Sequence, residues 1–219
     1  IFGGVMYMLD MVTAVSPYGS PELHQMCAAL TCMAHHYQLP MFGTCGCSDS
    51  KVVDAQAGLE MGFSVLTSTL SGQNLVHDIG YLESGLITSY EMYILADEAI
   101  GMAKHIARGI RVTRETLATE VIHEVGHTGE FMMHDHTLNN FRQEFYFPKY
   151  VDRKRYAAWE EAGRRTLYDQ LKEKADELID THKAAAIDTG ARARMMQILE
   201  EADRRSAGTT HRQGVAGNV

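Results

Sequence analysis

The chain has 219 residues, of which 45% are hydrophobic, and a formal net charge of −8. This acidic balance argues against nucleic acid as the main partner, because phosphate binding requires a basic face. No apolar stretch approaches the roughly 18 to 20 residues of a membrane span, and the N-terminus lacks the basic start of a signal peptide. We therefore expect a cytoplasmic protein with one substantial core and no membrane partner.

Short apolar runs alternate with amphipathic segments over the first half of the chain. The apolar runs predict three buried strands, at residues 1–8, 39–44 and 63–70. The amphipathic segments predict helices at residues 20–38, 52–61 and 88–109. Ser20 before Pro21 predicts the N-cap of the first helix, and Thr88 with Glu91 predicts a capping box for the last. This order predicts an α/β fold with parallel strands and helical crossovers.

Small and polar residues follow the second and third predicted strands. The first group runs from Cys45 to Lys51, and the second contains Gln73, His77, Asp78, Tyr81 and Glu83. A buried strand that opens into such residues, followed by a helix, is the repeating unit of a (β/α) barrel, and barrel sites lie at those strand ends. The chain is short for a barrel of about 250 residues. It also begins without Met inside a predicted strand, so we expect a partial chain.

The composition changes after Gly109. A helix is predicted from Thr113, and charged helices are predicted from Asp152 onward. The last residues are rich in Gly, Thr and Asn, which predicts a disordered tail. The expected regions are a barrel region at 1–150, peripheral charged helices at 151–205 and the tail at 206–219.

His123, Glu124 and His127 match the HExxH signature of zinc proteases. On a helix, this spacing places two zinc ligands one turn apart and a Glu that activates water. The Gly and His of the extended metzincin motif are absent, so the third ligand is unassigned. The alternative interpretation is a solvated helix face that ends at Gly126.

Two further groups are candidate metal ligands. Cys45 and Cys47 could hold a soft metal, but no Cys or His lies at the spacing of a zinc finger. His134 and His136 would share one side of an extended segment, yet such residues commonly cap helices, here one predicted to start near Thr137. We therefore predict no bound metal.

Six segments occur in a specific order and spacing. They are LDMVTA, SPYGSPEL, SDSKVVDAQAG, NLVHDIGYLESGLITSYEM, HTLNNFRQEF and DRKRYAAWEEAG. Together, from about Ile1 to Gly163, they resemble the trimethylamine methyltransferase family. This family includes a pyrrolysine-containing trimethylamine:corrinoid methyltransferase and homologues without pyrrolysine, some of which act on quaternary amines such as glycine betaine. Its members are about twice this length, so the resemblance implies the C-terminal portion of a (β/α)8 TIM-type barrel followed by peripheral helices.

The resemblance also implies an activity and a partner. Family members move a methyl group from a small methylated amine to the Co(I) centre of a separate corrinoid protein, so we expect no tightly bound cofactor in this chain. We also expect a homo-oligomer. The sequence contains only standard residues. If the pyrrolysine position falls within it, a quaternary amine becomes the expected substrate.

Because Co(I) is itself a strong nucleophile, the enzyme needs mainly to position and desolvate the methyl group. A quaternary ammonium group favours aromatic faces and nearby carboxylates. The candidates for this contact are Asp49, Asp78, Tyr81 and Glu83, with Asp10 as a weaker one. Gln73 and His77 are the candidates for hydrogen-bonding a substrate carboxylate. Each of these side chains could instead stabilise a loop, and catalytic and cofactor-binding residues are not assigned.

Three alternatives to corrinoid-dependent methyl transfer stay open. The first is a zinc-dependent hydrolase that uses His123, Glu124 and His127. The second is a zinc-dependent methyltransferase that uses the thiolates of Cys45 and Cys47. The third is an inactive fragment that serves as an interaction module.

Overall fold

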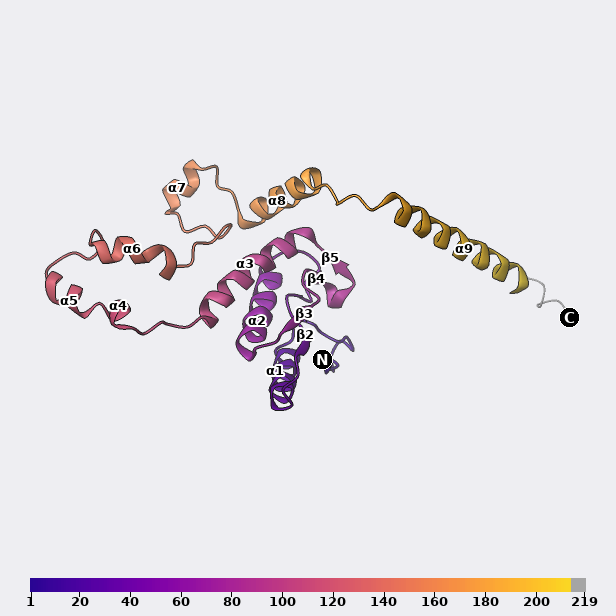
Figure 1. Ribbon diagram of the computed structural model, residues 1–219, viewed down its shortest axis with the longest axis horizontal. Helices are drawn as coiled ribbons and strands as arrows, with labels where there is room; N and C mark the ends of the chain where they lie inside the picture. The colour runs from indigo at the N-terminus through magenta and orange to yellow at the C-terminus, as the bar shows by residue number, and fades with distance from the viewer. Residues whose placement is uncertain (214–219) are drawn as a thin grey trace. The chain divides into compact units, whose positions relative to one another are not determined.

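The structure, a computed structural model, describes residues 1–213, with side chains as far as Ser206. Three parallel strands form its main sheet in the order β1-β2-β3, and β2 and β3 are labelled next to each other in Figure 1. They are β1 (Phe2–Gly3), β2 (Met41–Thr44) and β3 (Leu75–His77). The carboxyl ends of β2 and β3 are aligned, because Thr44 is paired with His77. The protein is therefore a mixed α/β protein with a small parallel sheet.

Three helices alternate with these strands. They are α1 (Pro21–His36), α2 (Ala55–Ser71) and α3 (Tyr90–Ala107). Ser20 caps α1 as predicted, and Asp54 caps α2 by accepting the N–H of Ala57. The cap of α3 is Ser89 and not Thr88, so the predicted capping box is wrong by one residue.

The hydrophobic core lies between α2, α3 and one face of the sheet. Its buried members are Cys45, Ala57, Met61, Val65, Leu82, Met92, Ala96 and Ala103. Val76 of β3 packs against this cluster, whereas its neighbours in the strand face the other way. On that opposite face Phe42 is 41% exposed and Leu75 is 47% exposed. The sheet therefore has one covered face and one open face.

The predicted strand at 63–70 is wrong, because these residues belong to α2. The helix buries Met61, Ser64, Val65 and Ser68, at helical spacing. Two of these buried residues are serines, so the buried face of this helix has no regular apolar pattern in the sequence. The first predicted strand, 1–8, is also too long, since β1 contains only two residues.

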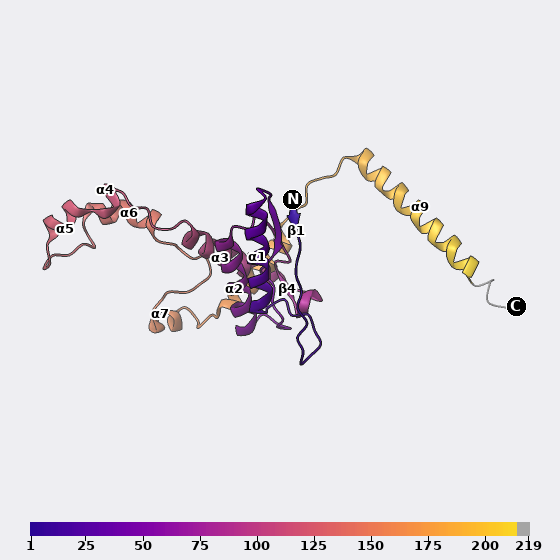
Figure 2. The ribbon, with the colours of Figure 1, turned by 90° about the horizontal axis from the view of Figure 1, so that it is seen from below.

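A small hairpin follows β3. Its strands are β4 (Tyr81–Leu82) and β5 (Ile87–Thr88), joined by the 3-10 turn η1 (Glu83–Gly85). In Figure 2 the loop between β1 and α1 extends past β4. The loops that follow the three strands meet at the same end of the sheet, because Asp49 binds Tyr18 and Ser84 from the other two loops.

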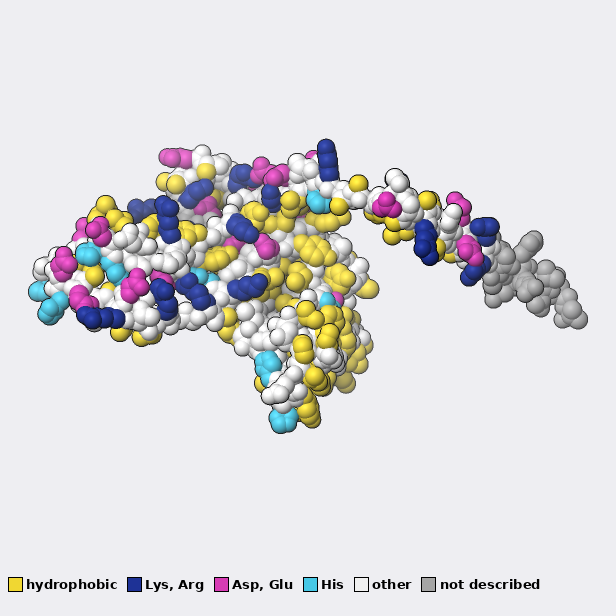
Figure 3. All heavy atoms as spheres, viewed as in Figure 1, with side chains coloured by type: hydrophobic (Ala, Val, Ile, Leu, Met, Phe, Trp, Pro, Cys, Tyr) yellow, Lys and Arg dark blue, Asp and Glu magenta, His cyan; other side chains and the backbone are white. Residues whose placement is uncertain are grey.

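In the chain as described up to residue 213, six helices follow α3. They are α4 (Arg114–Leu117), α5 (Thr119–Val125), α6 (Asp135–Glu144), α7 (Tyr156–Glu161), α8 (Leu167–Thr181) and α9 (Thr189–Gln213). Charged side chains gather over α4–α8, whereas hydrophobic and uncharged ones cover α1 and the sheet region (Figure 3). Within residues 1–213, no helix combines the length and apolar character needed to cross a bilayer.

The chain divides into two compact units, Ile1–Ile179 and the part from Asp180 onward. The second unit contains the long helix α9, which occupies part of the predicted tail at 206–219. The rest of that predicted tail, residues 214–219, lies outside the described residues.

A buried carboxylate fixes the segment after α6. Glu98 of α3 is 1% exposed, and its Oε2 accepts the N–H groups of Lys149 and Tyr150 at 2.8 and 3.0 Å. Its Oε1 accepts the hydroxyl of Tyr146 at 2.9 Å. Burial and this bond raise the pKa of Tyr146 to about 12. Glu98 thus ties residues 146–150 to α3.

Candidate functional site

A hydrogen-bonded chain of side chains lies at the carboxyl ends of β2 and β3. Oδ2 of Asp78 accepts the hydroxyl of Thr44 at 2.7 Å, and Nδ1 of His77 lies 2.7 Å from Oδ1 of Asp78. A carboxylate can only accept, so Nδ1 carries the hydrogen. The ring of His77 stacks on Phe42 with centroids 4.5 Å apart. Among the described residues, Nε2 of His77 has no hydrogen-bond partner, which leaves it for a ligand.

Asp49 joins the three loops that follow the strands. Its Oδ1 accepts the N–H of Tyr18 at 2.8 Å and the hydroxyl of Ser84 at 3.1 Å. Its Oδ2 accepts the N–H of Gly19 at 2.8 Å. These donors come from the loops after β1 and β3, while Asp49 itself follows β2. The carboxylate therefore organises this end of the sheet.

Glu60 of α2 binds the loop that contains Asp49. Its Oε2 accepts the hydroxyl of Ser48 at 2.6 Å and the N–H of Asp49 at 2.8 Å. A Cβ on Gly19 would collide with this carboxylate, so a larger residue there would have to displace it. The carboxylates of Asp49 and Glu60 consequently both hold the loop after β2 in place.

A cavity of about 410 Å³ lies among the same loops. Its polar lining comes mainly from Asp10, Asp49, Lys51, Glu60, Glu83 and Ser84. The carboxylate of Glu83 accepts no hydrogen bond from any described residue. Asp78, Glu83 and Ser84 have positive φ angles of 68°, 48° and 53°. Non-glycine residues held in this region often mark functional sites.

Three tyrosines surround the same loops, and only Tyr81 was singled out from the sequence. The hydroxyls of Tyr7 and Tyr18 are 2.8 Å apart, and their ring centroids are 5.4 Å apart. A Cβ on Gly85 would lie 3.7 Å from Cδ2 of Tyr81 and 3.8 Å from Cζ of Tyr18. Sequence reasoning missed Tyr7 and Tyr18, together with Phe42 and Thr44. The alternation within β2 could have identified the last two, whereas nothing local marks the tyrosines.

Gln73 does not lie at this end of the sheet. It was expected to follow a strand, but it precedes β3 and therefore lies near the opposite end from His77. Its Oε1 is buried without a hydrogen-bond partner in the described structure and lies against Gly43. The strand-end argument therefore does not apply to Gln73.

The two cysteines after β2 are buried thiols. Burial raises the pKa of Cys45 to about 11 and that of Cys47 to about 12. The thiolate is the form that binds zinc, so this environment disfavours a cysteine zinc site. In the described part of the chain, no group of three or more His, Cys, Asp or Glu side chains is arranged to hold a metal ion.

The HExxH match does not form the zinc-protease geometry. α5 ends at Val125, and Gly126 follows with φ 63° and ψ −169°. His127 therefore lies beyond the helix and not one turn from His123. Glu124 instead lies 3.7 Å from Nε2 of His134. The other ring nitrogen of His134, Nδ1, caps α6 by accepting the N–H of His136. The capping interpretation of His134 is confirmed, although α6 begins at Asp135 and not near Thr137.

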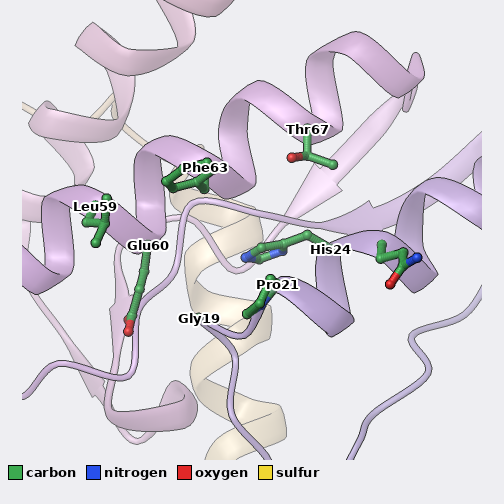
Figure 4. A pocket seen from close by; sticks show the side chains of 8 residues that line it. Gly19, Pro21, His24, Leu59, Glu60, Phe63 and Thr67 are labelled. Atoms are coloured by element: carbon green, nitrogen blue, oxygen red, sulfur yellow. The ribbon is translucent and has the colours of Figure 1, made fainter.

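A larger cavity, of about 560 Å³, lies between α1 and α2. Pro21 and His24 from α1 face Leu59 and Phe63 from α2 across it (Figure 4). His24 is 6% exposed, its Nε2 has no hydrogen-bond partner in the described structure, and burial lowers its pKa. Gly19 and Glu60 also line this cavity, but Asp49, His77, Asp78 and Glu83 do not, so the candidate site lies at the strand ends instead.

Parallel strands with helices between them define an α/β protein, and the polar and aromatic groups at the strand ends form its candidate binding site. The family model described as Trimethylamine methyltransferase (MTTB) matches residues 1–208. The chain therefore belongs to the trimethylamine methyltransferase family.

Individual relatives agree with this assignment. Over 203 residues the chain is 32% identical to a trimethylamine methyltransferase of Desulfitobacterium hafniense. These residues make up 93% of this chain and 41% of that relative. A trimethylamine methyltransferase of Methanosarcina barkeri is 32% identical over 206 residues. A glycine betaine methyltransferase of Desulfitobacterium hafniense is 36% identical over 160 residues, which cover 73% of this chain and 33% of that relative. The chain thus spans about two fifths of the length of the trimethylamine methyltransferases that it matches.

Proposed function

We propose that this protein takes part in the transfer of a methyl group from a small methylated amine to the Co(I) centre of a corrinoid protein. The observation that carries the proposal is the Thr44–Asp78–His77 chain at two adjacent strand ends, beside the ring of Phe42. Relatives named for trimethylamine and for glycine betaine support the substrate class. We further propose that the sheet is part of a (β/α)8 TIM-type barrel and that the protein is a homo-oligomer.

The transfer itself is a displacement at carbon. The electron pair of Co(I) forms the new bond to the methyl carbon, and the pair of the breaking C–N bond stays on the amine nitrogen. Cobalt ends as methyl-Co(III), and a quaternary ammonium leaves as a neutral tertiary amine without needing a proton. The protein therefore has to bind and orient the substrate and exclude water, which is catalysis by proximity.

His77 would bind the carboxylate of a betaine substrate. Because Asp78 holds the hydrogen on Nδ1, Nε2 can donate to a carboxylate only when the imidazole is protonated. Asp78 would stabilise that cation at 2.7 Å. Glu83 supplies negative charge for the ammonium end, Tyr81 supplies an aromatic face, and Asp78 acts through His77. Asp49 has a supporting role, because its oxygens already bind three protein donors.

The test is methyl transfer to a Co(I) corrinoid protein, followed by the absorbance change from Co(I) to methyl-Co(III). The substrates are trimethylamine, glycine betaine, carnitine and proline betaine. His77→Phe keeps a ring on Phe42 but removes the donor, so kcat/KM for a betaine should fall by about 10- to 100-fold, the value of a hydrogen bond to a charged group. His36→Phe, on the exposed end of α1, is the matched control. Absence of transfer from every substrate would refute the proposal.

A further inference from the structure

The long helix α9 has an apolar stripe that stays exposed in the described structure. Each residue of α9 whose side chain is described, 189–206, is exposed. Met195, Ile198 and Leu199 are 52%, 61% and 57% exposed, and their spacing places them on one side of the helix. Helices in proteins gain most of their stability by packing such a face against another surface. The stripe is therefore a candidate interaction surface.

The spacing within the stripe specifies the kind of partner. The residues along its centre recur at intervals of 4, 3 and 4 positions, and they are Ala191, Met195, Ile198 and Ala202. This is the a/d spacing of a coiled coil, in which the surface that fits the stripe is another helix with the same spacing. A second copy of the chain supplies such a helix, because its own α9 carries the same stripe. A symmetric pair of α9 helices therefore satisfies the pattern.

The charges of α9 give the direction of this pair. Arg192 and Arg194 precede the centre of the stripe, whereas Glu200, Glu201 and Asp203 follow it. In a parallel pair each of these charges would lie at the same height as the identical charge of the other copy, which is unfavourable. In an antiparallel pair Arg194 of one copy opposes Glu201 of the other, because both occupy the g position beside the stripe. By symmetry this ion pair forms twice, so the charges favour the antiparallel arrangement.

The ends of the helix fit the same register. With Met195 of one copy opposite Ile198 of the other, Asp188, which immediately precedes α9, lies opposite Arg205 of the second copy. Within one helix Arg205 lies 2.5 Å from Glu201. Exposed pairs of this kind contribute little to stability, so either residue can pair with the second copy instead.

We propose that α9 binds α9 of a second copy of this chain as an antiparallel helix pair. This inference rests on the proposed homo-oligomer, names the surface that joins two copies, and is independent of methyl transfer. Two neighbouring methionines provide the first test, because they are almost equally exposed, at 52% for Met195 and 50% for Met196, and only Met195 belongs to the stripe.

Sedimentation equilibrium of the purified full chain over a range of concentrations would measure the dissociation constant of the dimer. Met195→Gln places an unpaired amide in the contact of both copies, so this constant should rise by about 10- to 100-fold. Met196→Gln, the matched control, should change it by less than about 2-fold. Far-UV circular dichroism at a concentration where both variants are dimeric should show the helix content of the wild type.

Reversal of charge tests the direction of the pair. Arg194→Glu and Glu201→Arg should each raise the dissociation constant by about 3- to 10-fold, because like charges then meet at both symmetric contacts. The double variant should return close to the wild-type value, since the opposite charges are restored with their places exchanged. Glu200→Arg reverses a neighbouring charge on the outer side of the helix and should have little effect.

Equal effects of Met195→Gln and Met196→Gln would overturn the inference, as would a double charge variant that is no tighter than the single ones. A dimer whose dissociation constant is the same in every variant would overturn it and leave the proposed homo-oligomer standing. If the protein is monomeric at every concentration, both the helix pair and the homo-oligomer fail, whereas the methyl-transfer assay stands as a separate test.

Discussion

Replacement of Asp49 by asparagine tests whether this carboxylate holds the strand-end loops together. The carboxylate accepts three hydrogen bonds, from the N–H groups of Tyr18 and Gly19 and from the hydroxyl of Ser84. In Asp49→Asn the amide oxygen can keep the two bonds made to Oδ1. The amide nitrogen then faces the N–H of Gly19, so two donors oppose each other. A hydrogen bond to a charged group contributes about 1.5 to 3 kcal/mol, and the two remaining bonds lose their charge assistance.

We therefore expect the free energy of unfolding to fall by about 3 kcal/mol, measured by urea denaturation at constant m. Hydrogen exchange should accelerate at the amides of Tyr18 and Gly19, because their acceptors are weakened or lost. Asp135→Asn, at an exposed position that starts α6, should change stability by less than about 0.5 kcal/mol. A comparably small change for Asp49→Asn, together with loss of substrate binding, would refute a supporting role and make Asp49 a substrate contact.

Three further predictions concern groups outside the strand-end site. Glu98→Gln should lower the free energy of unfolding by about 2 to 4 kcal/mol and make the segment that it anchors sensitive to limited proteolysis; unchanged proteolysis would contradict the anchoring role. Burial lowers the pKa of His24, so as pH falls its imidazole is protonated in the unfolded chain before it is protonated in the folded protein. Thermal stability should therefore decrease as pH falls below 6.5, and His24→Gln should weaken this pH dependence. Cys45 and Cys47, whose pKa values are raised to about 11 and 12, should resist iodoacetamide at pH 8, whereas the exposed Cys32 reacts; equal rates would show that the first two are accessible.

The sequence predicted the elements in which local signals agree with tertiary packing. α1 has a Ser-Pro start and buries Leu23, Cys27, Thr31 and Ala34 at helical spacing. The strand predicted at 39–44 contains β2, because a short apolar run ends in small and polar residues after Thr44. These two elements place the loop after β2 at the carboxyl end of the sheet.

The strand predicted within α2 was wrong because neither face of this helix has the usual composition. Its covered face contains the buried residues Ser64 and Ser68. The hydroxyl of Ser64 donates to the carbonyl of Met61 and accepts the N–H of Gly46, so this polar side chain fits the core. Its other face carries Leu59 and Phe63, each 61% exposed, and Leu70, 59% exposed. With apolar residues on the exposed side and small polar ones on the buried side, residues 63–70 resemble a buried strand. Only the packing of α2 against α3 resolves this ambiguity.

The candidate site could be predicted as a region but not as a set of roles. Asp49, Asp78 and Glu83 are equivalent in the sequence, since each is an acidic residue after an expected strand. The structure separates them by the donors that each carboxylate already binds. Asp49 binds three protein donors and Asp78 binds Thr44 and His77, whereas no described donor reaches the carboxylate of Glu83.

The groups that lack a hydrogen-bond partner indicate where a ligand would bind. A buried or half-buried acceptor that is already satisfied gains little from a ligand, and an unsatisfied group gains the most. By this criterion the groups available to a substrate are Nε2 of His77, the carboxylate of Glu83 and the open ring of Tyr7, while Asp49 and Glu60 hold the loops that present them. A betaine carries a group suited to each of them, because its ammonium would complement the carboxylate of Glu83 and its carboxylate would complement the imidazole of His77. This pairing explains why we propose a betaine in preference to trimethylamine, which has no group for His77 to bind.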